Sequence, residues 1–238
     1  MDMEIVDNFN EAGNFTGKVL KNIGNMIVLI ILSIIPIVDF IALGYEARII
    51  REGKNLSEPP KLSEYGKLFV DGLKIVLAVI VYAIIPVAIL TALVLLTVPL
   101  IGFNLIFSPW TVLPQIAGLV ILALITLFFF LIFGVAAIGN MIRTNKFMKV
   151  FAFGETWAII SKMGFAKYIV WLILIFILGI ISGGLSAIPA VGWFIGMIVG
   201  VFVGIFVARS FGTWLDEILG PSVQPPPAPA AIPSPPTV

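Results

Sequence analysis

Two long stretches of the chain carry no charged residue at all. They cover residues 75–142 and 168–208, which are 68 and 41 residues long. A helix rises about 1.5 Å per residue, so roughly 20 apolar residues span the ~30 Å hydrocarbon core of a bilayer. Each stretch is therefore too long for one membrane crossing and long enough for two. The pattern predicts two helical hairpins in the membrane, each with both charged ends on one side.

A short phrase recurs three times and indicates where the chain turns. In each copy an apolar run and a hydroxyl-bearing residue precede a proline, at Pro36, Pro99 and Pro189. Proline lacks a backbone N–H and clashes with the preceding helical turn, so it favours a stop or a kink. The repeat predicts three hairpins with these prolines at their outer tips, unless the phrase recurs by chance in so apolar a sequence.

The first of these hairpins is the weakest. It would rise through residues 15–35 and return through residues 37–50, but the returning segment is short and carries Asp39, Glu46 and Arg48. If that segment continues one kinked helix, the chain has five crossings. The predicted fold is an all-α, polytopic transmembrane helical bundle of about six crossings, with five as the alternative.

Positive charge orients this bundle. Residues 45–74 carry six Lys or Arg and residues 143–167 carry five, and both segments share one face in either topology. By the positive-inside rule that face is cytoplasmic. Lys18 and Lys21 join it only with six crossings, which we therefore prefer. We expect a multi-pass protein of the cell membrane with both termini cytoplasmic. The tryptophans expected in the interfacial belts are Trp110 and Trp193 outside, and Trp157, Trp171 and Trp214 inside.

Composition agrees with a membrane protein and excludes several kinds of site. Hydrophobic residues make up 60% of the chain and charged residues 11%, where a soluble domain carries about 25% charged residues. There is no Cys and no His, which excludes disulfides, Cys-ligated clusters and the usual zinc sites. Asp39 is the only candidate for an ionisable group deep in the membrane. We therefore expect no enzyme, no cofactor and no nucleic-acid partner.

The chain divides into three segments by composition. Residues 1–14 are acidic and lack the basic start of a secretory signal. Residues 15–215 form the predicted transmembrane helical domain. Residues 216–238 form a tail rich in proline, which favours an extended, polyproline-like chain.

A row of small residues marks the last predicted crossing. The spacing of four places them on one face of a helix, and a face without side chains lets another helix approach closely. We expect the row to pack inside the monomer, or alternatively to form a seam between copies. It consists of Gly192, Gly196, Gly200, Gly204 and Ala208.

Two connecting segments have the apolar periodicity of cytoplasmic interfacial helices. They cover residues 62–73 and 146–163, and the second is strongly cationic. Such a helix attracts anionic lipid, with roughly 1 kcal/mol per cation near the surface, although the same cations also serve to set topology. The candidate lipid contacts are Arg143, Lys146, Lys149, Lys162 and Lys167.

Three runs of the sequence resemble a known family. Residues 44–53 begin Gly-Tyr and lead through a Pro-Pro pair into residues 66–74, which contain Val-Asp-Gly-Leu-Lys, and residues 151–155 read Phe-Ala-Phe-Gly-Glu. This pattern resembles a family of prokaryotic, often archaeal, multi-spanning membrane proteins of unknown function. Its layout is similar to the group that includes the membrane domain of glycerophosphodiester phosphodiesterases. The resemblance covers most of residues 24–215 and implies a helical membrane bundle, with no catalytic residues to transfer.

The function that the sequence favours is a non-enzymatic scaffold or accessory subunit of a membrane assembly or homo-oligomer. Its expected partners are membrane lipids and either a second copy or another membrane protein. The alternative is a transporter or channel for a small or lipidic solute. That alternative requires a hydrophilic cavity, and the sequence offers few residues to line one.

Overall fold

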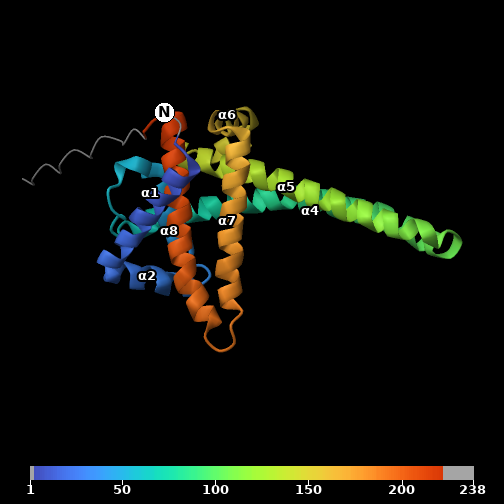
Figure 1. Cartoon of the computed structure of the whole chain (residues 1–238), viewed down its shortest axis with the longest axis horizontal. Coiled ribbons are helices and arrows are strands. Elements are labelled where there is room, and N and C mark those ends of the chain that lie inside the picture. Colours follow the sequence, from blue (N-terminus) through green and yellow to red (C-terminus); the bar gives the residue numbers. More distant parts are fainter. Residues whose placement is uncertain (1–2, 222–238) are drawn as a thin grey trace, which may run out of the picture.

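The computed structural model describes residues 3–221, and all regular structure within them is helical (Figure 1). The fold is therefore all-α, as the hydrophobic pattern predicts. Most of the predicted proline-rich tail, residues 222–238, lies outside the described residues. The α-helices are α1 (Ile5–Gly17), α2 (Ile23–Ile34), α3 (Phe40–Glu52), α4 (Tyr65–Phe107), α5 (Val112–Thr144), α6 (Phe153–Met163), α7 (Phe165–Ser186) and α8 (Gly192–Leu219). Short 3₁₀ turns are η1 (Lys18–Lys21), η2 (Gly53–Asn55), η3 (Pro109–Thr111) and η4 (Phe147–Phe151).

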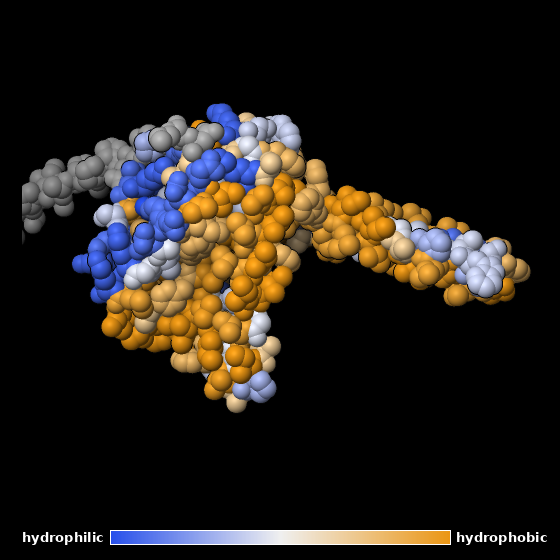
Figure 2. All heavy atoms as spheres, viewed as in Figure 1, coloured by the Kyte–Doolittle hydropathy of each residue, from blue (hydrophilic) through white to orange (hydrophobic). Residues whose placement is uncertain are grey.

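The two uncharged stretches form two long hairpins, α4–α5 and α7–α8. Both hairpins leave a common body and point in different directions, while α1 and α2 lie beside α8 (Figure 1). Hydrophilic residues gather on one side of this body, and both hairpins project away from that side with apolar surfaces (Figure 2). Both hairpins thus present apolar surfaces suited to lipid, and the polar side of the body is suited to water.

Four helical segments are long and apolar enough to cross a membrane. They are α4, α5 with the turn before it, α7 and α8; a fifth results if α1 and α2, which meet at 99°, count as one broken span. The described part of the chain thus has the helices of a multi-pass membrane protein. Six crossings stay a prediction, because α2 and α3 contain only 12 and 13 residues.

Two of the three repeated prolines lie at turns as predicted, and the third does not. Pro36 and Pro189 fall in the turns that follow α2 and α7. Pro99 lies inside α4, as does Pro86, and the chain turns only at residues 108–111. The predicted outer tip at Pro99 is therefore wrong. Helices in membranes tolerate proline because neighbouring groups satisfy the freed carbonyl.

One of the two predicted interfacial helices is a separate element. The segment over residues 146–163 forms η4 and α6, close to the predicted bounds. The segment over residues 62–73 is not a separate helix, because α4 begins at Tyr65 and continues without a break to Phe107. No residue between the amphipathic turns of α4 and its apolar part forces the chain to change direction. The two parts therefore form one continuous helix.

Residues of the motif that resembles the family hold α3 against α4. A Cβ atom on Gly44 would lie 1.8 Å from the carbonyl oxygen of Leu68, and one on Gly72 would lie 1.8 Å from the carbonyl oxygen of Phe40. Only glycine fits at such a close approach of two backbones. The hydroxyl of Tyr45 also donates a hydrogen bond to the carbonyl of Pro60 at 2.9 Å. The motif thus has a packing role in this chain.

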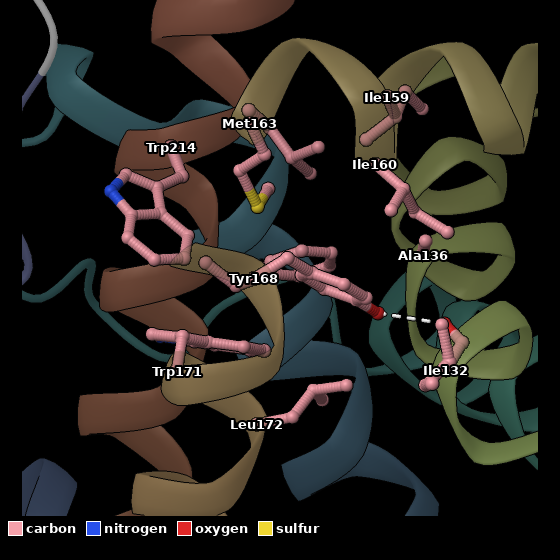
Figure 3. Packing of buried hydrophobic residues seen from close by; sticks show 11 residues of the cluster. Ile132, Ala136, Ile159, Ile160, Met163, Tyr168, Trp171, Leu172 and Trp214 are labelled. Carbon is pink, nitrogen blue, oxygen red and sulfur yellow. Dashed lines mark hydrogen bonds between the residues drawn. The ribbon is translucent and has the colours of Figure 1, made fainter. Parts of the chain in front are cut away.

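A second core joins α5, α6, α7 and α8 around aromatic side chains (Figure 3). Trp171 and Trp214 are 1% and 2% exposed, and their ring centroids lie 5.6 Å apart. Tyr168 donates a hydrogen bond to the carbonyl of Ile132 at 2.8 Å. These side chains fill the space between the helices, and their place in an interfacial belt stays a prediction.

Candidate functional site

The charged ends of the helices meet in a buried ionic junction. The Arg143 guanidinium forms an ion pair with Asp216, and these two side chains are only 6% and 3% exposed. Arg143 also donates to the carbonyl of Arg51 at 2.7 Å, and Asp216 accepts the backbone N–H of Lys54. This junction ties the end of α5 to the end of α8 and to the loop after α3.

Two further ion pairs extend the junction to α4 and α1. Arg51 contacts Asp71 at 2.9 Å, while the guanidinium of Arg209 donates to Glu11 at 2.8 Å. Asp71 and Arg209 are buried, so each charge is stable there because its partner compensates the lost hydration. These ion pairs thereby join the ends of α1, α3, α4, α5 and α8, and the junction has a structural role.

A polar cavity of about 240 Å³ lies between α2, α3 and α8. Three of its lining side chains are polar, and the rest are apolar or small. It lies level with Gly200, the middle of the uncharged stretch of α8 at residues 192–208. The polar lining consists of Ser33, Asp39 and Glu46, beside the Tyr45 ring.

The carboxylates of this cavity face no cation. The Glu46 side chain forms no hydrogen bond or ion pair with any described residue, and Asp39 is the charged residue that acts on it. The nearest cations on the lining helices are already paired, Arg48 with Glu52 and Arg209 with Glu11. Two carboxylates with a serine hydroxyl are oxygen ligands, so the cavity can hold a small cation or protons.

The glycine row of α8 forms the wall of this cavity and the contact with α7. A Cβ atom on Gly204 would lie 2.0 Å from the Glu46 carboxylate, so a larger residue there would displace this flexible side chain from its present position against α8. Gly192 and Gly196 approach the end of α7 near Ser186, and Ala208 is buried. Gly200 has no atom within 4 Å of its Cβ position and opens to the cavity. A seam between copies along this row stays a prediction.

The five candidate lipid cations do not form one patch. Arg143 belongs to the ionic junction, and Lys149 forms an ion pair with Glu155. Lys146 is exposed, whereas Lys162 and Lys167 line one cavity. Hydrogen bonds from Lys149 and Asn140 hold the pKa of the Glu155 carboxyl below its ordinary value.

Sequence reasoning missed most of the polar contacts that position these helices. Asn8, in the acidic N-terminal segment, is fully buried and donates to the carbonyl of Ser210 at 2.9 Å and to Thr213 at 2.8 Å. The Trp171 indole donates to the hydroxyl of Ser210 at 2.8 Å. No spacing rule points to these contacts, because they join residues between 39 and 205 positions apart. Within residues 3–221, no three acidic side chains gather as a metal site.

Fold and junction together define a multi-pass, all-helical membrane protein. A family described as "Protein of unknown function (DUF4013)" matches residues 27–208, more than half of the chain, and the chain belongs to that family. No curated protein and no solved structure matches the chain. The expected membership of a family of unknown function is thus confirmed, while its prokaryotic, often archaeal, distribution and the likeness to phosphodiesterase membrane domains stay predictions.

Proposed function

We propose that the protein is a membrane transporter or channel that binds a small cation in the cavity between α2, α3 and α8. The observation that carries this proposal is the pair Asp39 and Glu46, which face a cavity without a neutralising partner. A charged side chain among membrane helices costs on the order of 3 kcal/mol, so unpaired carboxylates there are the default candidates for a functional site.

The contrast with the ionic junction supports this function. Arg143 and Asp216 pair directly, as structural charges do. The Glu46 carboxyl group instead lies beside Gly204 and lines a cavity that can hold a ligand. The sequence alone disfavoured a transporter because it offered few residues to line a cavity, and the arrangement of α2 and α3 against α8 supplies them.

The test is cation flux into liposomes that contain the purified full chain. We expect uptake of a monovalent cation or of protons, and we expect Glu46→Gln to reduce the rate at least tenfold, because the amide cannot carry the compensating charge. Glu58→Gln is the matched control, since Glu58 is exposed and pairs with Lys21 outside the cavity. Equal flux in wild type and Glu46→Gln would contradict the proposal.

A second function, assembly with another membrane protein, is favoured by the outer half of the α4–α5 hairpin. This part extends beyond the body of the molecule (Figure 1), and Trp110 at its tip is 91% exposed. The side-chain oxygen of Gln115 is buried there without a hydrogen bond. Polar groups of this kind join helices in membranes because they find donors on a partner.

This second function predicts a stable complex. We expect native mass spectrometry in mild detergent to show a dimer of this chain, and we expect Gln115→Leu to reduce the dimer fraction. Thr126→Val is the control, because the Thr126 hydroxyl already donates within α5 to Leu122 at 2.8 Å. A strictly monomeric wild-type chain would exclude the homo-oligomer.

A further inference from the structure

A second cavity, of about 210 Å³, lies at the polar end of the α7–α8 hairpin. It is lined by Lys162 from the last turn of α6, Lys167 from the first turn of α7, and Trp214 and Glu217 from α8. It shares no lining residue with the cavity of Asp39 and Glu46. Its chemistry is therefore independent of the proposed cation site.

The indole of Trp214 lines this cavity, and its N–H is the only polar group of the side chain. Trp214 is 98% buried, yet its N–H donates to no described residue, in contrast to the N–H of Trp171, which donates to Ser210. The indole nitrogen points away from the hydrophobic cluster that holds the ring (Figure 3). This N–H is not among the buried unpaired polar atoms of the described residues, so it reaches accessible space, where a ligand or water can accept its hydrogen bond.

Positive charge surrounds that donor. Lys162 is exposed and forms no ion pair among residues 3–221, and Lys167 makes only long contacts, 3.3 Å to the carbonyl of Met3 and 4.0 Å to Glu4. Glu217 also lines the cavity, but its carboxylate accepts the backbone N–H of Met3 at 2.8 Å. Helix α7 begins here without a side-chain cap, so the positive end of its dipole adds to the two ammonium groups.

We infer that Lys162, Lys167 and the Trp214 N–H form a binding site for a phosphate group, and that the phosphate belongs to an anionic phospholipid headgroup. The uncharged stretch of α7 and α8 begins one residue after Lys167, which is the depth at which headgroups meet a membrane helix. Inorganic phosphate presents the same oxygens, so the experiment separates the two sources.

The experiment measures lipid retention by native mass spectrometry on the full chain in detergent, titrated with phosphatidylglycerol or with phosphatidylcholine. We expect phosphatidylglycerol to bind in preference, and Lys162→Gln to weaken that binding about fivefold, the effect of removing one cation near a lipid surface. Trp214→Phe removes the N–H but keeps a ring in the core, and we expect a similar loss. Lys146→Gln is the control, because it removes the same charge from an exposed site outside the cavity.

Inorganic phosphate at millimolar concentration is the competing probe. Retention of phosphatidylglycerol in its presence supports the lipid headgroup, whereas displacement assigns the site to phosphate itself and overturns the lipid assignment. If Lys146→Gln and Lys162→Gln weaken phosphatidylglycerol binding equally, surface charge alone attracts the lipid. That result would overturn the proposed binding site. Because Lys162 is exposed, its variant folds even if Trp214→Phe does not. None of these outcomes depends on cation flux through the other cavity.

Discussion

Single residues decide how closely the backbones of this protein approach one another. The contact between Gly72 and the carbonyl of Phe40 leaves no room for a side chain, whereas Gly204 lies against the movable carboxylate of Glu46. Other glycines, such as Gly66 and Gly102, have no atom within 4 Å of a Cβ position. Some glycines of this chain therefore permit a close contact and others have no packing neighbour. Only the structure distinguishes the two groups.

Gly72→Ala tests the close approach of α3 and α4. We expect it to lower stability by about 1–3 kcal/mol, the usual cost of forcing atoms into a packed core, because its Cβ would meet backbone rather than a flexible side chain. Gly66→Ala in the same helix is the control, and we expect it to be neutral or slightly stabilising. Thermal unfolding in detergent measures both. Equal midpoints for the two variants would contradict the packing account.

At the scale of elements, the sequence predicted α6, the two long hairpins and the turn at Pro36, but it did not predict α1. The two charge-free stretches were sufficient to predict α4, α5, α7 and α8, because few structures other than helices are stable in a bilayer over such lengths. The site at Asp39 was recognised only in part, and Glu46 was read as a sign of a weak crossing. The role of Glu46 depends on the packing of α3 against Gly204 of α8. Local sequence patterns do not encode this contact, because the two elements are about 150 residues apart.

Helix α6 is attached to α5 by a contact that depends on pH. Hydrogen bonds from Lys149 and Asn140 favour the charged form of Glu155 and lower its pKa below the ordinary 4.5. A carboxylate with a lowered pKa stabilises the fold fully above its ordinary value and loses that contribution as the pH falls through the lowered one. We expect a small effect because the pair is exposed.

Unfolding midpoints measured across acidic pH test this contact. Wild type should lose more stability than Glu155→Gln as the pH falls below 4.5, because the glutamine variant has no carboxylate to protonate. Lys149 and Asn140 remain in place in both proteins, so the difference reports the titration of Glu155 alone. Parallel curves for the two proteins would show that the contact does not support α6.

At the scale of the whole molecule, one ionic junction connects the ends of both hairpins. Arg143 from α5 and Asp216 from α8 meet there, next to the backbone of Lys54. The tip of α4–α5 at Trp110 lies at the far end of its hairpin (Figure 1). If lipid covers the apolar hairpins, the junction lies on one side of the membrane and that tip lies on the other.

Single-cysteine labelling tests this arrangement most directly, because the native chain has no cysteine. Lys54→Cys, Lys149→Cys and Trp110→Cys would each be exposed to an impermeant thiol reagent in sealed membranes, before and after permeabilisation. The account predicts that positions 54 and 149 react from the same side and position 110 from the opposite side. Labelling of positions 54 and 149 from opposite sides would contradict it.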